Sequence, residues 1–189
     1  VHSGVSGESH AGISQGWADL LPRLAEQASG AEAPAPAPAL LPAEELASRL
    51  NTALIHLRWV IEDCPTERWT ATTEGGWTVA ATADHAVFHT GVVGLARAVA
   101  DGQHPPQAAI TLDQLSQRND EQARERAAVS REVVLAALLL DGPKAVEAVK
   151  AFTDADLARI TTLAAAGGAS VSAAEILAGP LVGNIEEHT

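Results

Sequence analysis

The sequence predicts an all-α fold, a four-helix bundle with one long crossover connection. Apolar residues make up 47% of the 189 residues but aromatic residues only 3%, so the core must be built from Leu, Val, Ile and four Trp. This composition is typical of packed helices. Apolar residues recur at helical spacing, and few runs alternate apolar with polar residues. A chain of this length supplies one domain with a full core and a short appendage at most.

The first 42 residues are predicted to be an extension of that domain. Residues 13–29 predict a short amphipathic helix, because four apolar residues stand at helical spacing: Trp17, Leu20, Leu21 and Leu24. AEAPAPAPALLP, residues 31–42, alternates Ala and Pro, which favours an extended linker or surface strap. We therefore divide the chain into an N-terminal extension, residues 1–42, and a helical bundle domain, residues 43–189.

The first bundle helix is expected from Pro42 to about Asp63. Pro42 suits a first-turn position, and Pro65 ends the helix. The apolar stripe of this helix has five members: Leu46, Leu50, Leu54, Leu57 and Ile61. Trp59 and Trp69 are expected to be packing residues.

The later helices begin at residues suited to N-caps. Thr78 begins a second helix that is expected to run to Asp101, before Gly102. SAAE, residues 172–175, has the pattern of a capping box and begins the last helix. Between them we expect helices from Thr111 to Val129 and from Ser130 to about Phe152, and a short turn after Thr153.

Charge and cysteine content exclude several classes of partner. The 12 Lys and Arg against 24 Asp and Glu give a formal charge of −12, which repels nucleic acid and anionic membrane surfaces. No apolar run approaches the ~20 residues that span a bilayer. The single Cys64 excludes an internal disulfide and a cysteine-rich zinc site. A single cysteine fits a reducing cytoplasm, and the first residues lack the basic-then-apolar order of a signal peptide, so we expect a cytoplasmic protein.

Two polar pairs have the spacing of a site inside a bundle. His85 and His89 are four residues apart on the second helix and share a face, roughly 6 Å from each other. Asp84 lies on a neighbouring face. Asn184 and His188 have the same spacing on the last helix. Residues of this kind, converging from different helices, form metal sites that keep a position open to water.

The alternative is a set of buried histidines that are merely hydrogen-bonded, and spacing alone does not decide between the two. His56, on the first helix next to Leu57, favours this alternative because nothing around it has ligand character. Glu186 and Glu187 are expected to form a solvated face.

Three segments resemble a known family. RWTATTEGGWTVAATADHAVFHTG, with Trp77 eight residues before His85, resembles the second-helix signature of the DinB/YfiT-like superfamily. QLSQRNDEQARERAAVSREVVLAAL and VSAAEILAGPLVGNIEEHT are similar to the third, fourth and last helices of one branch. That branch contains mycothiol-dependent maleylpyruvate isomerase. The resemblance covers roughly residues 43–189.

The resemblance implies one divalent metal, zinc or nickel, held by a His on the second helix and a pair four residues apart on the last helix. His85 takes the first role. Aligning GNIEEH with the family pattern puts Asn184 in place of the first partner and His188 in place of the second. Asn is a poor zinc ligand. In a second register His188 is the first partner, and the next ligand falls at position 192. His89 is a substitute ligand, or an acid or base near the metal.

The function that this resemblance implies is a metal-dependent thiol transferase, isomerase or hydrolase acting on a small electrophilic metabolite. A divalent cation brings the pKa of a bound low-molecular-weight thiol, or of water, close to neutrality. The expected residues are the metal ligands His85, His188 and Asn184, the general base His89 or His56, the substrate-orienting Asn119, and Trp77 beside the cofactor or anchoring the helix in the core.

Two other functions remain open. A metal-free bundle would bind or convert a small molecule without a thiol cofactor, and the Asn at position 184 favours it. A structural or partner-binding module would use the Ala/Pro tract as a tether. The expected oligomeric state is a monomer or a homodimer.

Overall fold

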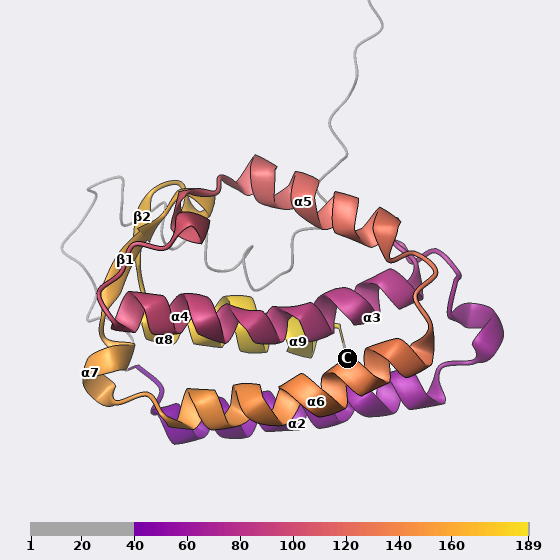
Figure 1. Cartoon of the computed structure of the whole chain (residues 1–189), viewed down its shortest axis with the longest axis horizontal. Helices are drawn as coiled ribbons and strands as arrows, with labels where there is room; N and C mark the ends of the chain where they lie inside the picture. Colours follow the sequence, from indigo (N-terminus) through magenta and orange to yellow (C-terminus); the bar gives the residue numbers. More distant parts are fainter. Residues whose placement is uncertain (1–39, 189) are drawn as a thin grey trace, which may run out of the picture.

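The described part of the protein is an all-α bundle. A computed structural model describes residues 40–188, so the predicted N-terminal helix and most of the Ala/Pro tract lie outside it. Four helical rods run along the long axis in Figure 1. They are α2 (Ala43–Asp63); α3 (Val79–Phe88) followed by α4 (Val92–Ala100); α6 (Arg131–Lys150); and α8 (Ala173–Ile176), a π-helical segment (Leu177–Gly183) and α9 (Asn184–Glu187).

The first rod, α2, packs along α6 (Figure 1). All five members of the predicted apolar stripe of α2 are buried: Leu46, Leu50, Leu54, Leu57 and Ile61. Each buried side chain of this size contributes about 1.5–3 kcal/mol. Pro42 is the N-cap of α2 and not a first-turn residue. Trp69 is buried as predicted, but Trp59 is 57% exposed, so its assignment as a packing residue was wrong.

The second rod begins where the sequence predicts and is interrupted in the middle. The Thr78 hydroxyl accepts a hydrogen bond from the backbone N–H of Ala81, which confirms the cap. The expected continuous helix is instead broken by a 3₁₀ turn, His89–Gly91, that separates α3 from α4. Thr90 and Gly91 in this turn are weak helix formers.

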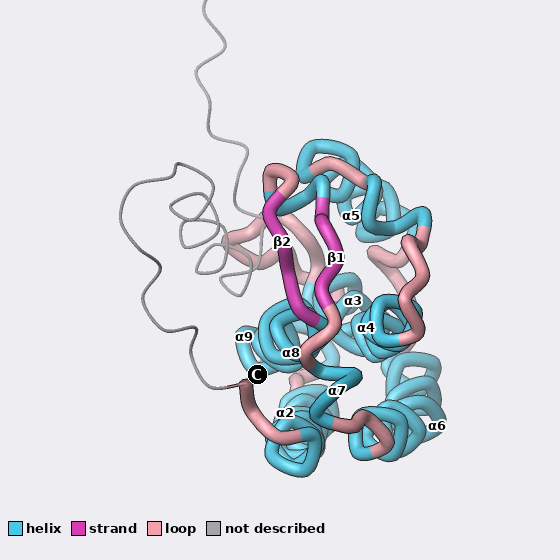
Figure 2. The backbone as a smooth tube through the Cα atoms, turned by 90° about the vertical axis from the view of Figure 1, so that its left-hand side faces the viewer, coloured by secondary structure: helices cyan, strands magenta, loops and turns pink. Residues whose placement is uncertain are grey.

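The crossover helix α5 (Leu112–Glu125) lies outside the four-rod core. It starts with a capping box at Thr111, as the cap predicts. Figures 1 and 2 show α5 on the opposite side of α3 and α4 from α2 and α6. Only Ala123 of this helix is buried. Helix α5 therefore covers the bundle without filling it, which leaves room for a cavity beneath it.

A β-hairpin, which the sequence analysis did not predict, joins the third and fourth rods. It follows the short helix α7 (Asp154–Leu157) that Thr153 caps as expected. Strand β1 (Ile160–Leu163) pairs antiparallel with β2 (Ala169–Ser172), and Gly167 and Gly168 turn the chain with φ of 65° and 82° (Figure 2). Only Gly adopts such angles without strain.

The last rod starts at Ser172, as the predicted capping box requires. The Ser172 hydroxyl accepts a hydrogen bond from the N–H of Glu175, whose carboxylate accepts one from the N–H of Ser172. The rod is not a regular α-helix, because its middle is π-helical and contains Pro180. Among the described helices, none is long and apolar enough to cross a membrane.

Candidate metal centre and adjoining cavity

Three histidines gather where the second rod meets the last one. Nε2 of His85 on α3 lies 3.0 Å from Nε2 of His89, which starts the 3₁₀ turn. The ring of His188 is centred 6.1 Å from that of His85, and Trp77 packs edge-on against His85 with ring centroids 5.0 Å apart. The i, i+4 pair predicted on the second helix is therefore together, and His188 of the predicted second pair is beside it.

The hydrogen bonds of His89 determine which ring nitrogens carry protons. Nδ1 of His89 lies 2.7 Å from the carbonyl oxygen of Pro180, which only accepts, so Nδ1 carries the hydrogen. Nε2 of His89 then has a free lone pair, and Nε2 of His85 is the donor between the two rings. Nδ1 of His85 is left as an acceptor, and it is buried without a hydrogen-bond partner among the described residues.

The π-helical segment makes the Pro180 carbonyl available to His89. In a regular α-helix the backbone N–H of Asn184 would donate to the carbonyl four residues earlier, that of Pro180. Here it donates to the carbonyls of Gly179 and Leu181. Pro180 itself has no N–H to continue an α-helical ladder, which favours such an irregularity. The backbone of the last rod thereby orients an imidazole on the second rod.

Burial keeps these imidazoles neutral. It lowers the pKa of His85 to about 3, with smaller contributions from the neighbouring His89 and His188. Burial also lowers the pKa of His89 to about 4, against the opposing effect of the hydrogen bond to Pro180. The pKa of His188 is lowered by burial too, and Glu187 opposes that shift. Neutral imidazoles keep a lone pair, which is the form that binds a metal or accepts a proton.

Asn184 contributes a second buried acceptor without a partner. Its side chain is 2% exposed, and Oδ1 makes no hydrogen bond within the described residues. An orphaned buried acceptor costs about 1–3 kcal/mol. Nδ1 of His85 is in the same condition. Native proteins rarely leave such groups unpaired, so each one indicates a missing partner such as a ligand, an ion or water.

A cavity of about 630 Å³ lies between α4 and α5, and His89 and Pro180 are part of its wall. Most of its lining is apolar. Asn119, which was predicted to orient substrate, lines it together with Gln122 one turn further along α5. A side-chain interaction with Gln122 opposes the lowering of the His85 pKa, although no contact between Gln122 and Nδ1 of His85 has the geometry of a hydrogen bond. The volume is in the range of pockets that hold small molecules.

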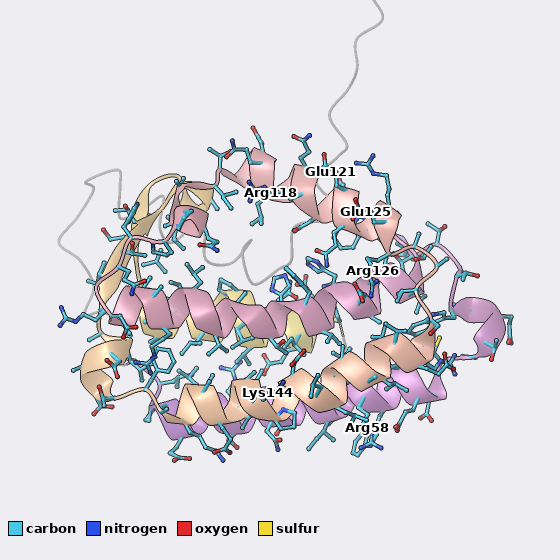
Figure 3. The ribbon with its side chains drawn as sticks, in the orientation of Figure 1. Arg58, Arg118, Glu121, Glu125, Arg126 and Lys144 are labelled. Carbon is cyan, nitrogen blue, oxygen red and sulfur yellow. The ribbon has the colours of Figure 1, made fainter. Side chains whose placement is uncertain are left out.

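The predicted general base His56, and Asp84 on the face next to His85, are not part of the cluster. His56 is on the exposed side of α2, with its ring centred 5.5 Å from that of Trp59. Asp84 forms a two-fold hydrogen-bonded ion pair with Arg126, at 2.9 and 2.7 Å, and ties α3 to the end of α5. Figure 3 labels Arg126 at this end of the helix.

Comparison with known proteins identifies the family. A family model described as the DinB superfamily matches residues 49–179. The chain belongs to the DinB superfamily. The match includes His85 and His89 and ends before Asn184 and His188. No match was found among curated proteins or among solved structures.

The donors of this DinB-superfamily chain fit a divalent metal through the paired imidazoles. Zinc binds imidazole nitrogen at about 2.0–2.1 Å, so two tetrahedral ligands have nitrogens about 3.3 Å apart. The 3.0 Å between Nε2 of His85 and Nε2 of His89 is close to that spacing, and metal binding would require the other neutral tautomer of His85, with its hydrogen on Nδ1. Residues 40–188 contain no group of three or more His, Cys, Asp or Glu arranged to hold a metal ion.

Sequence reasoning missed the contribution of Pro180 and Gln122. A proline inside a predicted helix was the available signal for the first, because it breaks the backbone ladder. For Gln122 the sequence offered no signal, because the position of α5 over the second rod depends on long-range packing.

Proposed function

We propose that this DinB-superfamily protein is a metal-dependent enzyme that acts on a small electrophilic metabolite. The observation that carries the proposal is the position of His89. Its Nε2 is 3.0 Å from that of His85, and the residue also lines the cavity between α4 and α5. A group held by the paired imidazoles would therefore face a molecule in the cavity.

In this proposal the paired imidazoles of His85 and His89 hold zinc or nickel, and His188, whose ring is centred 6.1 Å from that of His85, would become a third ligand by moving toward them. In one register of the resemblance Asn184 aligns with a family ligand, and His89 would then supply the imidazole that Asn184 lacks. The hydrogen bond from Nδ1 of His89 to Pro180 orients the ring with its Nε2 lone pair directed at Nε2 of His85, and a metal between the two nitrogens would replace the hydrogen that they share. When bound, the metal would lower the pKa of a coordinated thiol or water, so that a thiolate or hydroxide would be available at neutral pH.

In this proposal the substrate binds in the cavity between α4 and α5. Its apolar wall excludes water from a bound molecule, while the amides of Asn119 and Gln122 orient it. The resemblance to the branch with mycothiol-dependent maleylpyruvate isomerase suggests a low-molecular-weight thiol as the nucleophile, for a transferase or isomerase reaction.

Metal content tests the proposal. The purified full chain, incubated with zinc or nickel and dialysed, is expected to retain about one equivalent of metal by elemental analysis. His85→Ala and His89→Ala should lose it while circular dichroism confirms their folding. His56→Ala is the matched control, since that ring is exposed and beside Trp59. Metal-free wild-type protein, or equal retention by the His85→Ala variant, would overturn the proposal.

A metal-free small-molecule binder is the second candidate. Its support is the hydrogen-bonded chain from His85 through His89 to the Pro180 carbonyl, which partly satisfies both imidazoles without a metal. This candidate predicts that chelator-treated protein binds its ligand as tightly as the metal-loaded protein does.

A further inference from the structure

We infer that the cavity between α4 and α5 binds a small molecule with an apolar body and one carboxylate, and that Arg118 is the residue that recognises the carboxylate. This inference rests on the proposed function in one respect, that the substrate binds in this cavity. It names the chemical class of that substrate and a specificity-determining residue.

Charge is the first argument. The chain carries 24 acidic against 12 basic residues, yet the lining of this cavity contains no Asp or Glu among the described residues. Its one Lys or Arg is Arg118, labelled on α5 in Figure 3. A cavity that has a cation and lacks acids, in so acidic a protein, favours an anion.

Arg118 is also available for a ligand. Within residues 40–188 it has neither an ion-pair partner nor a hydrogen-bond partner. Glu121, one turn along α5, accepts a hydrogen bond from Gln117 instead. The guanidinium group binds carboxylates through two parallel hydrogen bonds. The amides of Asn119 and Gln122 add donors on the same cavity wall.

The glycines of the second rod are the second argument. A Cβ built on Gly94, inside α4, or on Gly91 just before it, would meet no atom within 4 Å. Gly142 in α6 differs, because its Cβ would lie 3.3 Å from Cδ1 of Leu54, so packing explains that glycine. Glycine weakens a helix, so its presence at positions 91 and 94 calls for a reason. Packing within the described protein does not provide one, because a larger side chain would fit at both positions.

Both unexplained glycines border the cavity. Gly91 and Gly94 line it, and they also line a neighbouring cavity of about 770 Å³ between α4 and α6. Phe88, 67% exposed, lines both cavities as well. Gly91 and Gly94 have no side chain, so an apolar or planar group of a ligand could contact their backbone closely and pack against the exposed ring of Phe88.

Calorimetric titration of chelator-treated full chain tests the inference independently of any metal. The probes are phenylalkanoates with chains of two to six carbons and the matching primary amides, which keep the body and remove the charge. At least one acid is expected to bind, at least tenfold more tightly than its amide. Arg118→Gln should abolish this preference. Arg124→Gln, on the same helix and bonded to the Asp120 backbone carbonyl, should retain it.

A second variant separates binding from folding. Gly94→Leu places a side chain in open space, so it should fold with an unchanged or higher melting temperature and weaken acid binding at least tenfold. Equal binding of acids and amides, no binding of any acid, or an intact preference in Arg118→Gln would overturn the inference. None of these outcomes depends on metal content. The metal-retention experiment therefore tests the proposed function separately from this inference.

Discussion

Nδ1 of His89 donates to the Pro180 carbonyl at 2.7 Å while Nε2 of the same ring lies 3.0 Å from Nε2 of His85. The imidazole of His89 thus links the π-helical segment of the last rod to His85, the one buried histidine of the second rod within residues 40–188. The orientation of the proposed metal ligand depends on an irregularity in another helix, and that dependence can be tested.

Pro180→Ala should weaken metal binding. The alanine N–H can donate to the carbonyl of Ile176, which favours a regular α-helix in which Asn184 donates to the carbonyl of residue 180. That donor competes with Nδ1 of His89. Loss of a partner that orients a ligand typically costs 10–100-fold in metal affinity. Competitive zinc titration checks this, with the melting temperature expected not to fall.

A variant within the same π-helical segment serves as the control for this prediction. Ala178→Ser, two residues before Pro180 in the same segment, leaves the proline and its carbonyl in place and should keep zinc affinity within about twofold. Unchanged zinc affinity in Pro180→Ala would show that the π-helical segment does not position His89.

Acid should destabilise the metal-free protein. Burial lowers the pKa of His85 to about 3 and that of His89 to about 4, whereas their ordinary value is 6.5. At a pH between the folded-state pKa and 6.5, the unfolded chain binds more protons than the folded protein. The free energy of unfolding therefore falls as the pH drops below about 6.5. One such histidine costs about 2 kcal/mol at pH 5. Denaturant unfolding at pH 7 and pH 5 measures the loss.

The double variant His85→Gln, His89→Gln should reduce this pH dependence, since it removes the two most strongly shifted groups. A free energy of unfolding that is the same for wild type at pH 7 and pH 5 would show that these imidazoles are not held neutral by the fold.

The Asp84–Arg126 ion pair should contribute to the stability of the fold but have no effect on metal affinity. Asp84→Asn removes a two-fold ion pair whose Arg126 side chain is 39% exposed, so solvent screening limits the cost to about 1 kcal/mol. A double-mutant cycle with Arg126→Gln isolates the coupling. The exposed pair Arg58–Glu62 is the comparison and should give less. Loss of metal on Asp84→Asn would instead make Asp84 part of the centre.

Local sequence signals predicted most of the fold. The apolar stripe of α2 and the caps Thr78, Thr111 and Ser172 depend on neighbouring residues, and all of them were confirmed. The hairpin was missed because its strands are only four residues long and its turn, Ala164–Gly168, reads as an Ala/Gly run inside helical sequence. Two such strands are stable only with the packing that the rest of the chain provides.

The candidate site was predictable within a helix and not between helices. The spacing of His85 and His89 predicted a shared face, and their rings are in contact. His56 has the same chemistry, but it faces away from the bundle, because the rotation of α2 is set by its apolar stripe. Which histidines meet across the bundle depends on rod packing, and the sequence pattern carries no direct signal for that.

The central claim is that the paired imidazoles of His85 and His89 hold a metal. The X-ray absorption spectrum of the zinc-loaded full chain tests this claim most directly. The account predicts at least two imidazole nitrogens at about 2.0–2.1 Å from the zinc. The His89→Ala variant, which loses zinc on dialysis and is therefore measured with excess zinc present, should show one fewer imidazole nitrogen, and the His56→Ala spectrum should match wild type. Zinc bound without imidazole, or a spectrum unchanged by His89→Ala, would contradict it.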